Sequence, residues 1–195
     1  MYLRLAFPTK RIVLLAGLIF AASQASNAHA QAIGATKIAM ADIQLGQSDE
    51  TAGGVVRRTV RSIVDYSRFP EGRTPRTLCV VGRSKYGSHL GDIGLANGTR
   101  LSSKIVSAST FDFAGCDIVY LGQMAMQQMR NVTSAVRGKS VLTIAENDPE
   151  CRSRSMFCLV FTPSSLSFKL DIDAISRSGV RVDPRVLRLS KSEDS

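Results

Sequence analysis

Four cysteines, at positions 79, 116, 151 and 158, carry the most distinctive chemistry in this sequence. Cys151 and Cys158 lie seven positions apart in the stretch 150-ECRSRSMFCLVF-161, on either side of a short basic loop. Such a pair could be a metal clamp, a redox centre or a covalent cross-link. Zinc sites usually show C-x2-C spacing or histidine ligands, and thioredoxin-like centres show C-x-x-C. The sequence has no such cysteine pair, and His89 is the only histidine after position 30, so it favours a cross-link and no metal site.

The N-terminal 30 residues indicate the compartment in which these cysteines pair. Three basic residues precede an apolar run at 12–22, and the small-residue motif Ala28-His29-Ala30 follows. This is the pattern of a secretory signal peptide that is cleaved after Ala30. A membrane anchor needs about 20 apolar residues, and this run is much shorter. We therefore expect residues 1–30 to be a signal peptide and the mature protein to reside in the periplasm.

In an oxidising compartment, an even number of cysteines predicts disulfide bonds. The short spacing of Cys151 and Cys158 favours a local bond, which leaves Cys79 to pair with Cys116. In the chain-entropy treatment, closing the longer loop contributes about 4 kcal/mol of stability and closing the shorter one about 2.5 kcal/mol. The sequence thus predicts a domain held by two disulfides, with no free thiol.

The charge of the chain argues against nucleic-acid binding. The formal net charge of +9 includes the three basic residues of the signal peptide, so the mature chain carries 22 Lys and Arg against 16 Asp and Glu, a net charge of +6. Its basic residues are scattered along the sequence, and aromatic residues make up only 6% of the chain. Nucleic-acid-binding domains concentrate basic residues on one face. We expect no nucleic-acid partner.

No set of residues matches a catalytic motif. The stretch 82-GRSKYGSHL-90 has the G-x-x-x-x-G spacing of a phosphate-binding loop, but Ser88 and His89 follow where that loop needs a lysine and a hydroxyl. No G-x-S-x-G elbow exists that could pair with His89 in a catalytic triad. Asp171 and Asp173 lie at a predicted helix start, where an N-cap and a first-turn charge are their usual roles. We expect neither enzymatic activity nor a cofactor.

The order of strand and helix patterns predicts an α/β fold. Short apolar runs indicate buried strands, and apolar residues spaced three to four apart indicate amphipathic helices. The expected strands are 77–82, 101–107, 117–122, 140–146, 156–161 and 166–172, and the expected helices begin near Glu50, Gln123 and Asp171. This order is typical of a mainly parallel sheet flanked by helices, here with a C-terminal antiparallel hairpin. We expect a single domain over 49–191, a loose lead-in at 31–48 and a tail at 192–195.

Taken in order, six segments of the chain resemble the YfiR family of periplasmic regulators. They are Phe69-Pro70 at a helix end, 78-LCVVG-82, 116-CDIVYLG-122, 140-SVLTIAE-146, the loop from Cys151 to Cys158, and 179-GVRVDPRVLRLSK-191. Together they span about residues 50–191, and the four cysteines are placed as in the disulfide-bearing branch of the family. The chain departs from the family in Phe69, where tryptophan is common, and in 152-RSRSMF-157, where many relatives have a glycine-rich turn.

The resemblance implies a repressor. YfiR-like proteins bind the periplasmic sensor domain of an inner-membrane diguanylate cyclase, YfiN, and hold it inactive, which lowers cyclic-di-GMP and restrains biofilm growth. An outer-membrane lipoprotein, YfiB, can sequester the repressor, and reduction can release it. Family members also occur as homodimers. We therefore expect a YfiN-like cyclase as partner, a YfiB-like lipoprotein as a second one, and a homodimer with redox-sensitive disulfides.

Two groups of residues are candidates for binding the partner. Arg152 and Arg154 lie in the basic loop, and Arg185, Leu187 and Arg188 lie in the C-terminal stretch, where arginines alternate with apolar residues. Arginine is enriched at the centres of interfaces. An edge strand with one face in the core would produce the same alternation, and this is the favoured interpretation of the C-terminal stretch.

Small-ligand sensing is the alternative function. In a parallel α/β sheet, ligands bind beyond the carboxyl ends of the strands, which here lie near Gly82 and Gly122. The domain would then sense or carry a periplasmic ligand and feed a membrane signalling protein.

Overall fold

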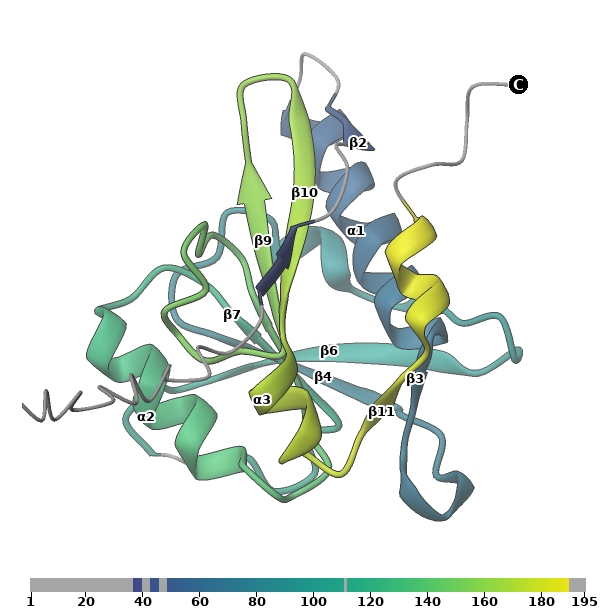
Figure 1. Ribbon diagram of the computed structural model, residues 1–195, viewed down its shortest axis with the longest axis vertical. Coiled ribbons are helices and arrows are strands. Elements are labelled where there is room, and N and C mark those ends of the chain that lie inside the picture. The colour runs from purple at the N-terminus through teal and green to yellow at the C-terminus, as the bar shows by residue number, and fades with distance from the viewer. Residues whose placement is uncertain (1–36, 40–42, 46–48, 111, 190–195) are drawn as a thin grey trace, which may run out of the picture. The chain divides into compact units, whose positions relative to one another are not determined.

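The computed structural model describes residues 37–39, 43–45, 49–110 and 112–189 (Figure 1). The expected signal peptide at 1–30 and the expected tail at 192–195 lie outside the described residues. Within the described ranges, no helix combines the length and the apolar character needed to cross a membrane.

A mixed sheet of nine strands forms the centre of the domain. In spatial order its strands are β1 (Lys37–Ala39), β10 (Ser165–Asp171), β9 (Phe157–Phe161), β8 (Leu142–Ala145), β7 (Ile118–Leu121), β4 (Thr77–Val81), β6 (Arg100–Val106) and β5 (Ile93–Gly94), and β2 (Ile43–Gln44) also pairs with β10. The central strands β9, β8, β7, β4 and β6 are parallel, and the pairs at both edges are antiparallel. The predicted α/β fold with its β9–β10 hairpin is confirmed.

Two helices, α1 (Asp49–Asp65) and α2 (Met126–Val136), pack against opposite faces of this sheet. The apolar face predicted for the first helix is buried, with each side chain at most 2% exposed: Val56, Val60, Ile63 and Val64. Successive strand residues point to opposite faces, so Val80 of β4 joins the α1 cluster and Val81 joins the α2 cluster. The parallel strands are thus covered on both sides, as their continuous apolar runs require.

The chain after β10 folds onto the α1 face. Asp171 caps α3 (Ile172–Ser176) by accepting a hydrogen bond of 3.0 Å from the Ala174 amide, which is the N-cap role predicted for it. β11 (Arg181–Val182) then pairs antiparallel with β3 (Ser67–Arg68) in a separate two-stranded sheet. The 3₁₀ helix η3 (Pro184–Arg188) runs beside α1 (Figure 1), and its Val186 is fully buried in the α1 cluster.

The C-terminal stretch is therefore not an edge strand of the main sheet, and that interpretation was wrong. Only two of its residues form strand, because Asp183 and Pro184 turn the chain into η3. Proline has no N–H to continue a ladder, and the Asp183 carboxylate caps the new helix by accepting from the Arg185 amide at 2.9 Å. The alternation of apolar and basic residues reflects one buried side of a 3₁₀ helix.

The lead-in at 31–48 contains two strands that the sequence did not predict. β1 pairs with β10 from Lys37 opposite Asp171 to Ala39 opposite Lys169, and β2 pairs with the start of β10 through Ile43 opposite Leu166. Strands of two or three residues are too short to show a period of two. They form strands because they pair with β10.

Both predicted disulfides are present, and no cysteine is free. Cys79–Cys116 joins β4 to the segment that enters β7, with the Cα atoms 5.7 Å apart. Cys151–Cys158 joins the loop after β8 to β9, with the Cα atoms 5.4 Å apart. All four side chains are buried, so both cross-links belong to the core.

The two disulfides should contribute unequally to stability. Replacing Cys79 and Cys116 by alanine removes a cross-link across 37 positions, and replacing Cys151 and Cys158 removes one across seven. The first double variant should lose about 1.4 kcal/mol more free energy of unfolding than the second, because the longer loop restricts the unfolded chain more. Urea unfolding of the two variants measures this difference, and equal free energies of unfolding would contradict it.

Candidate functional site

The carboxyl ends of the central strands are where a ligand was expected, and backbone closes this place. The strand order β6-β4-β7 puts the switch point between β4 and β7, where open α/β sheets bind ligands. Here Arg83 and Gln123, which follow the two strands, exchange backbone hydrogen bonds of 3.2 and 2.6 Å. Gly122 packs so closely that a Cβ atom on it would lie 2.5 Å from the Arg83 carbonyl oxygen. The crevice expected near Gly82 and Gly122 is filled.

The loop 82–87 does bind a negative charge, but the charge belongs to the protein. Glu146, directly after β8, is 2% exposed. Its carboxylate accepts hydrogen bonds from the Lys85 amide (2.7 Å), the Tyr86 amide (3.2 Å) and the Ser84 hydroxyl. Successive N–H groups of a turn form an anion-binding concavity. Because Glu146 uses these donors, they are not free for the phosphate that the loop spacing suggested.

Tyr120 on β7 places a polar atom in the core beside this carboxylate. Its side chain is fully buried, and its hydroxyl lies close to the Glu146 carboxylate without reaching the geometry of a hydrogen bond to any described residue. Burial, and after it the negative charge of Glu146, raise the pKa of Tyr120 well above the ordinary value of 10.0. A buried hydroxyl without a partner costs free energy, so this position is a weak point of the fold.

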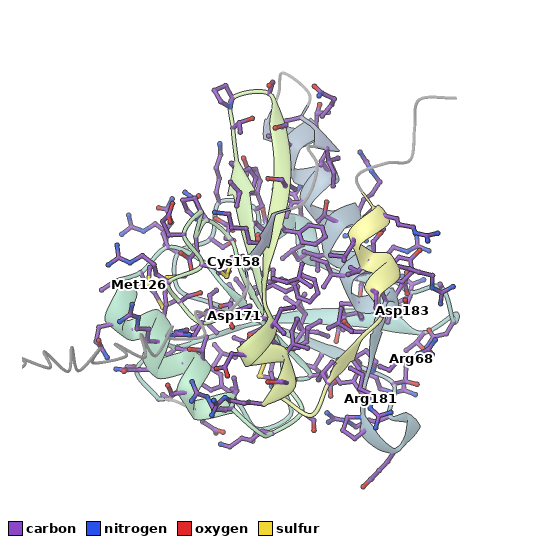
Figure 2. The ribbon with its side chains drawn as sticks, viewed as in Figure 1. Arg68, Met126, Cys158, Asp171, Arg181 and Asp183 are labelled. Atoms are coloured by element: carbon purple, nitrogen blue, oxygen red, sulfur yellow. A yellow bond between two sulfur atoms is a disulfide. The ribbon has the colours of Figure 1, made fainter. Side chains whose placement is uncertain are left out.

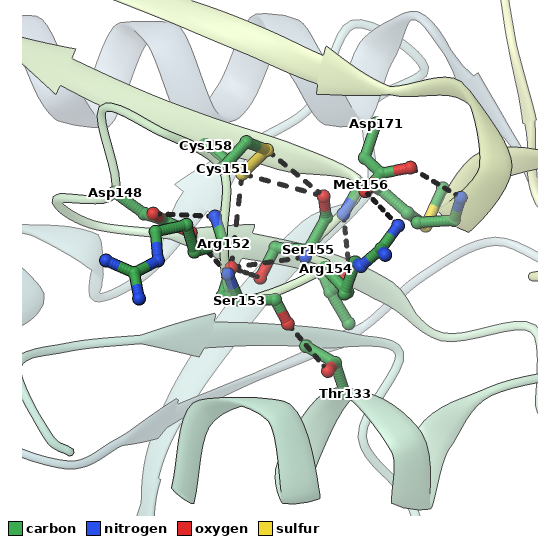
Figure 3. Close-up of a disulfide and its surroundings, with 12 residues drawn as sticks. Thr133, Asp148, Cys151, Arg152, Ser153, Arg154, Ser155, Met156, Cys158 and Asp171 are labelled. Carbon is green, nitrogen blue, oxygen red and sulfur yellow. Dashed lines mark hydrogen bonds and ion pairs between the residues drawn. A yellow bond between two sulfur atoms is a disulfide. The ribbon is translucent and has the colours of Figure 1, made fainter. Parts of the chain in front are cut away.

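The disulfide loop is organised around a second buried carboxylate, that of Asp148 (Figure 3). Asp148 is 2% exposed, and its two oxygens accept hydrogen bonds from the Arg152 amide (2.9 Å) and the Ser153 amide (2.7 Å). Its backbone carbonyl accepts a third one from the Cys151 amide at 2.8 Å. A side chain that binds successive amides in this way fixes the path of a loop.

Contacts to α2 and β8 hold the same loop against the domain. They are hydrogen bonds from Arg130 Nε to the Arg152 carbonyl (2.9 Å), from the Thr133 hydroxyl to the Ser153 carbonyl (2.8 Å) and from the Met156 amide to the Thr143 hydroxyl (2.9 Å). None of these bonds involves a sulfur atom. The path of the loop therefore has support besides the disulfide.

Arg152 and Arg154, which were predicted to bind a partner, are the exposed residues of the segment from Cys151 to Cys158, whose other residues are buried. The guanidinium of Arg154 lies 3.9 Å from the carboxylate of Asp171, a fully buried side chain whose Oδ2 makes no hydrogen bond with a described residue. Arg154 therefore helps to balance a buried charge. The Arg152 side chain has no ion-pair partner in the described part of the chain.

Arg185, Leu187 and Arg188, the other predicted residues, lie on η3. The Arg185 guanidinium binds both oxygens of Asp183 at 2.7–3.1 Å, and these hydrogen bonds lower the pKa of Asp183 to about 2. Leu187 is half-buried against the α1 cluster. Arg188 is exposed and has no ion pair with a described residue. Of these three side chains, Arg188 has the fewest described interactions within the protein.

The structure does not bring the two predicted groups together. The disulfide loop is held by α2, on one face of the sheet, whereas η3 packs into the α1 cluster on the other face. They are two separate candidate surfaces.

A groove of about 710 Å³ lies beside the C-terminal stretch, lined by the end of α1, residues 67–75 and 95–97, and Gly179 and Arg181. Arg68 on β3 and Arg181 on β11 line it from directly opposed positions of their ladder (Figure 2). Both are exposed, and neither is in an ion pair with a described residue. Like charges directly opposite destabilise a ladder. An anionic group bound in the groove would relieve this repulsion.

Sequence reasoning missed these groups for different reasons. Glu146 and Asp148 lie in 146-END-148, directly after a buried strand. Acidic residues at such a position could have indicated carboxylates that bind the neighbouring loops. Arg68 and Arg181 are far apart in the sequence, and only the pairing of β3 with β11 places them side by side.

Replacing Tyr120 by phenylalanine should raise or preserve stability at neutral pH, by up to about 1 kcal/mol, because it removes a buried hydroxyl without a partner. The folded protein holds the Tyr120 proton more tightly than the unfolded chain, whose tyrosine pKa is 10.0. The contribution of Tyr120 ionisation to the free energy of unfolding is therefore fully present below pH 10, and it is lost as the pH rises further. Tyr120→Phe should weaken this fall. Urea unfolding between pH 7 and 11 tests both parts, and a less stable variant at pH 7 would contradict the first.

A family model described as YfiR/HmsC-like matches residues 54–191. The match covers more than two thirds of the chain and runs from within α1 to beyond η3. It includes both disulfides, the buried carboxylates of Glu146 and Asp148, and the groove arginines. This agrees with the resemblance carried by the strand and cysteine motifs. The chain belongs to the YfiR/HmsC-like family.

Proposed function

We propose that this protein is a periplasmic repressor that binds the periplasmic sensor domain of an inner-membrane diguanylate cyclase and holds the cyclase inactive. The family match over residues 54–191 is the observation that carries the proposal, since it supports a periplasmic regulator of a cyclic-di-GMP pathway. The two disulfides fit an oxidising compartment. Sequestration by a YfiB-like lipoprotein and homodimerisation extend the proposal on the strength of the family resemblance.

Inhibition by such a protein needs no chemistry of its own. A protein that binds one conformation of the cyclase more tightly than another shifts the equilibrium between them by its differential affinity. A shift from mostly active to mostly inactive cyclase takes about 5.5 kcal/mol of differential binding at most. A protein surface with a few well-placed anchors supplies free energies of this size.

The groove lined by Arg68 and Arg181 is the first docking surface that we propose. Arg68 and Arg181 are exposed and form no ion pair with a described residue, although Arg68 also attracts the Asp183 carboxylate. Arg188 is a further exposed arginine on η3, outside the lining of the groove. An acidic segment of the sensor domain would gain hydrogen bonds to both guanidinium groups and remove their mutual repulsion. Arg185 contributes less, because Asp183 already holds it.

The disulfide loop is the second docking surface that we propose. Its exposed Arg152 and Arg154 are held in place by Asp148, by α2 and by the disulfide. Reduction would loosen this surface, which links redox state to repression.

Sensing of a small ligand is the second candidate function, and the volume of the groove favours it. Ligand pockets measure about 300–1,000 Å³, and the groove lined by Arg68 and Arg181 measures about 710 Å³. A carboxylate-bearing ligand would compete with the cyclase for Arg68 and Arg181. The ligand would then act as a signal that releases the cyclase.

Deleting the gene tests the regulatory role. Loss of the repressor should raise cellular cyclic-di-GMP in a strain that retains the cognate cyclase, because the cyclase is then unrestrained. A strain that lacks both genes is the matched control and should show no rise. Unchanged cyclic-di-GMP in the single deletion, with the cyclase shown to be produced, would reject the proposal.

Arg181→Glu separates docking from folding. The substitution replaces a like-charge pair with Arg68 by an opposite-charge pair, so the free energy of unfolding should stay the same or rise by about 0.2–1 kcal/mol. Affinity for the sensor domain should fall about tenfold to a hundredfold, because an arginine at a docking centre is replaced by a repelling charge.

Lys104→Glu is the matched control, because Lys104 is exposed on β6 and lies outside the groove. Binding of both variants to the purified sensor domain can be measured by calorimetry. Equal affinities for Arg181→Glu and wild type would rule out the groove as the docking surface.

A further inference from the structure

Two oxygen atoms that could bind a metal ion lie beside the sulfur atoms of Cys151 and Cys158. Both Sγ atoms and a carboxylate oxygen of Asp148 lie within 4.8 Å of one another, and all three residues are buried. The Ser155 carbonyl oxygen lies 3.7 Å from the Cys151 Sγ and 3.6 Å from the Cys158 Sγ. With metal–ligand distances typical of tetrahedral zinc, neighbouring sulfur and oxygen ligands lie about 3.6 Å apart. The carbonyl oxygen is therefore already at ligand distance from both sulfurs.

We propose that this loop becomes a zinc site when its disulfide is reduced. The ligands are the thiolates of Cys151 and Cys158, the carboxylate of Asp148 and the carbonyl of Ser155. Two thiolates select zinc over magnesium and calcium, which prefer oxygen ligands alone. The expectation of no metal site rested on cysteine spacing and on the lack of histidine ligands. The fold adds Asp148 and Ser155, which the spacing rule did not consider.

Reduction must come before metal binding. A dithiol reductant gives two electrons and two protons to the Cys151–Cys158 disulfide, whose S–S bond breaks to form two thiols, and the reductant becomes a disulfide. Zn²⁺ then displaces the two thiol protons, which pass to water. The loop is thus closed by a covalent bond in the oxidised protein and by a metal ion in the reduced protein.

The loop is prepared for this exchange. The Arg152 and Ser153 amides orient the Asp148 carboxylate, as outer hydrogen bonds orient metal ligands in known sites. Hydrogen bonds to α2 and β8 hold the loop without using the sulfurs. After reduction, the two sulfur atoms need to separate only to about 3.8 Å to occupy two corners of a zinc tetrahedron. Zinc would restore the link that reduction removes and so oppose loss of the loop structure.

Metal analysis of the mature protein in two redox states tests the proposal. Each sample is treated with zinc chloride and freed of unbound metal by gel filtration, and the reduced sample is prepared with a phosphine, which does not compete as a thiol. We expect about one zinc per chain in the reduced protein and none in the oxidised protein. Zinc should also protect Cys151 and Cys158 from alkylation, while the reduced Cys79 and Cys116 serve as internal controls and gain no protection. Absence of zinc from the reduced protein, or equal protection of all four thiols, would overturn the proposal.

Asp148→Asn tests the carboxylate ligand. Asparagine keeps an oxygen that can accept a loop amide, but it removes the charged ligand, so zinc affinity of the reduced protein should fall about tenfold or more. Glu150→Gln is the matched control, because Glu150 is an exposed acidic residue of the same loop, and it should leave the affinity unchanged. Equal affinities for Asp148→Asn and wild type would overturn the proposed ligand set. If Asp148→Asn does not fold when reduced, Co²⁺ in the reduced wild type decides: strong tetrahedral and thiolate absorption bands support the site, and weak octahedral bands overturn it.

Discussion

Two buried carboxylates at the end of β8, those of Glu146 and Asp148, fix the two loops that surround the carboxyl ends of the central strands. Glu146 binds the loop that follows β4, through the amides of Lys85 and Tyr86. Asp148, two residues further, binds the disulfide loop through the amides of Arg152 and Ser153. A buried carboxylate without donors would cost several kcal/mol. Moving either loop away would leave its buried carboxylate without hydrogen-bond donors. This cost in free energy holds each loop in one conformation.

This arrangement closes the place where an α/β sheet of this type usually binds a ligand. The donors of the loop 82–87 are used by Glu146, and backbone hydrogen bonds between Arg83 and Gln123 fill the switch point. What remains available lies on the outer surfaces: the groove with Arg68 and Arg181, and the arginines of the disulfide loop. Exposed arginines on these surfaces would suit an acidic protein partner.

The features that could be predicted from the sequence are those that depend on local patterns. Apolar spacing located α1, and continuous apolar runs located the parallel strands β4, β7 and β8. Parity and short spacing gave both disulfides. The cysteine, proline and strand motifs led to the family that the family model confirms.

The features that could not be predicted depend on contacts between distant segments. β1 and β2 are strands because they pair with β10, which follows them by more than 100 residues in the sequence. The C-terminal stretch was interpreted as an edge strand because alternation does not distinguish a strand from a 3₁₀ helix with one buried side, and Pro184 decides between them. The opposition of Arg68 and Arg181 arises only when β3 and β11 pair. The predicted binding residues fell on two faces for the same reason, since the sequence does not show which loops share a face.

Direct inhibition can be tested by reconstituting the cyclase. The full-length cognate cyclase is placed in lipid nanodiscs, the mature oxidised protein is added in increasing amounts, and the rate of cyclic-di-GMP synthesis from GTP is measured. Direct inhibition predicts that the rate falls and saturates over the same concentrations at which the two proteins bind. A rate that stays constant while binding is complete, or an absence of binding to the intact cyclase, would contradict it.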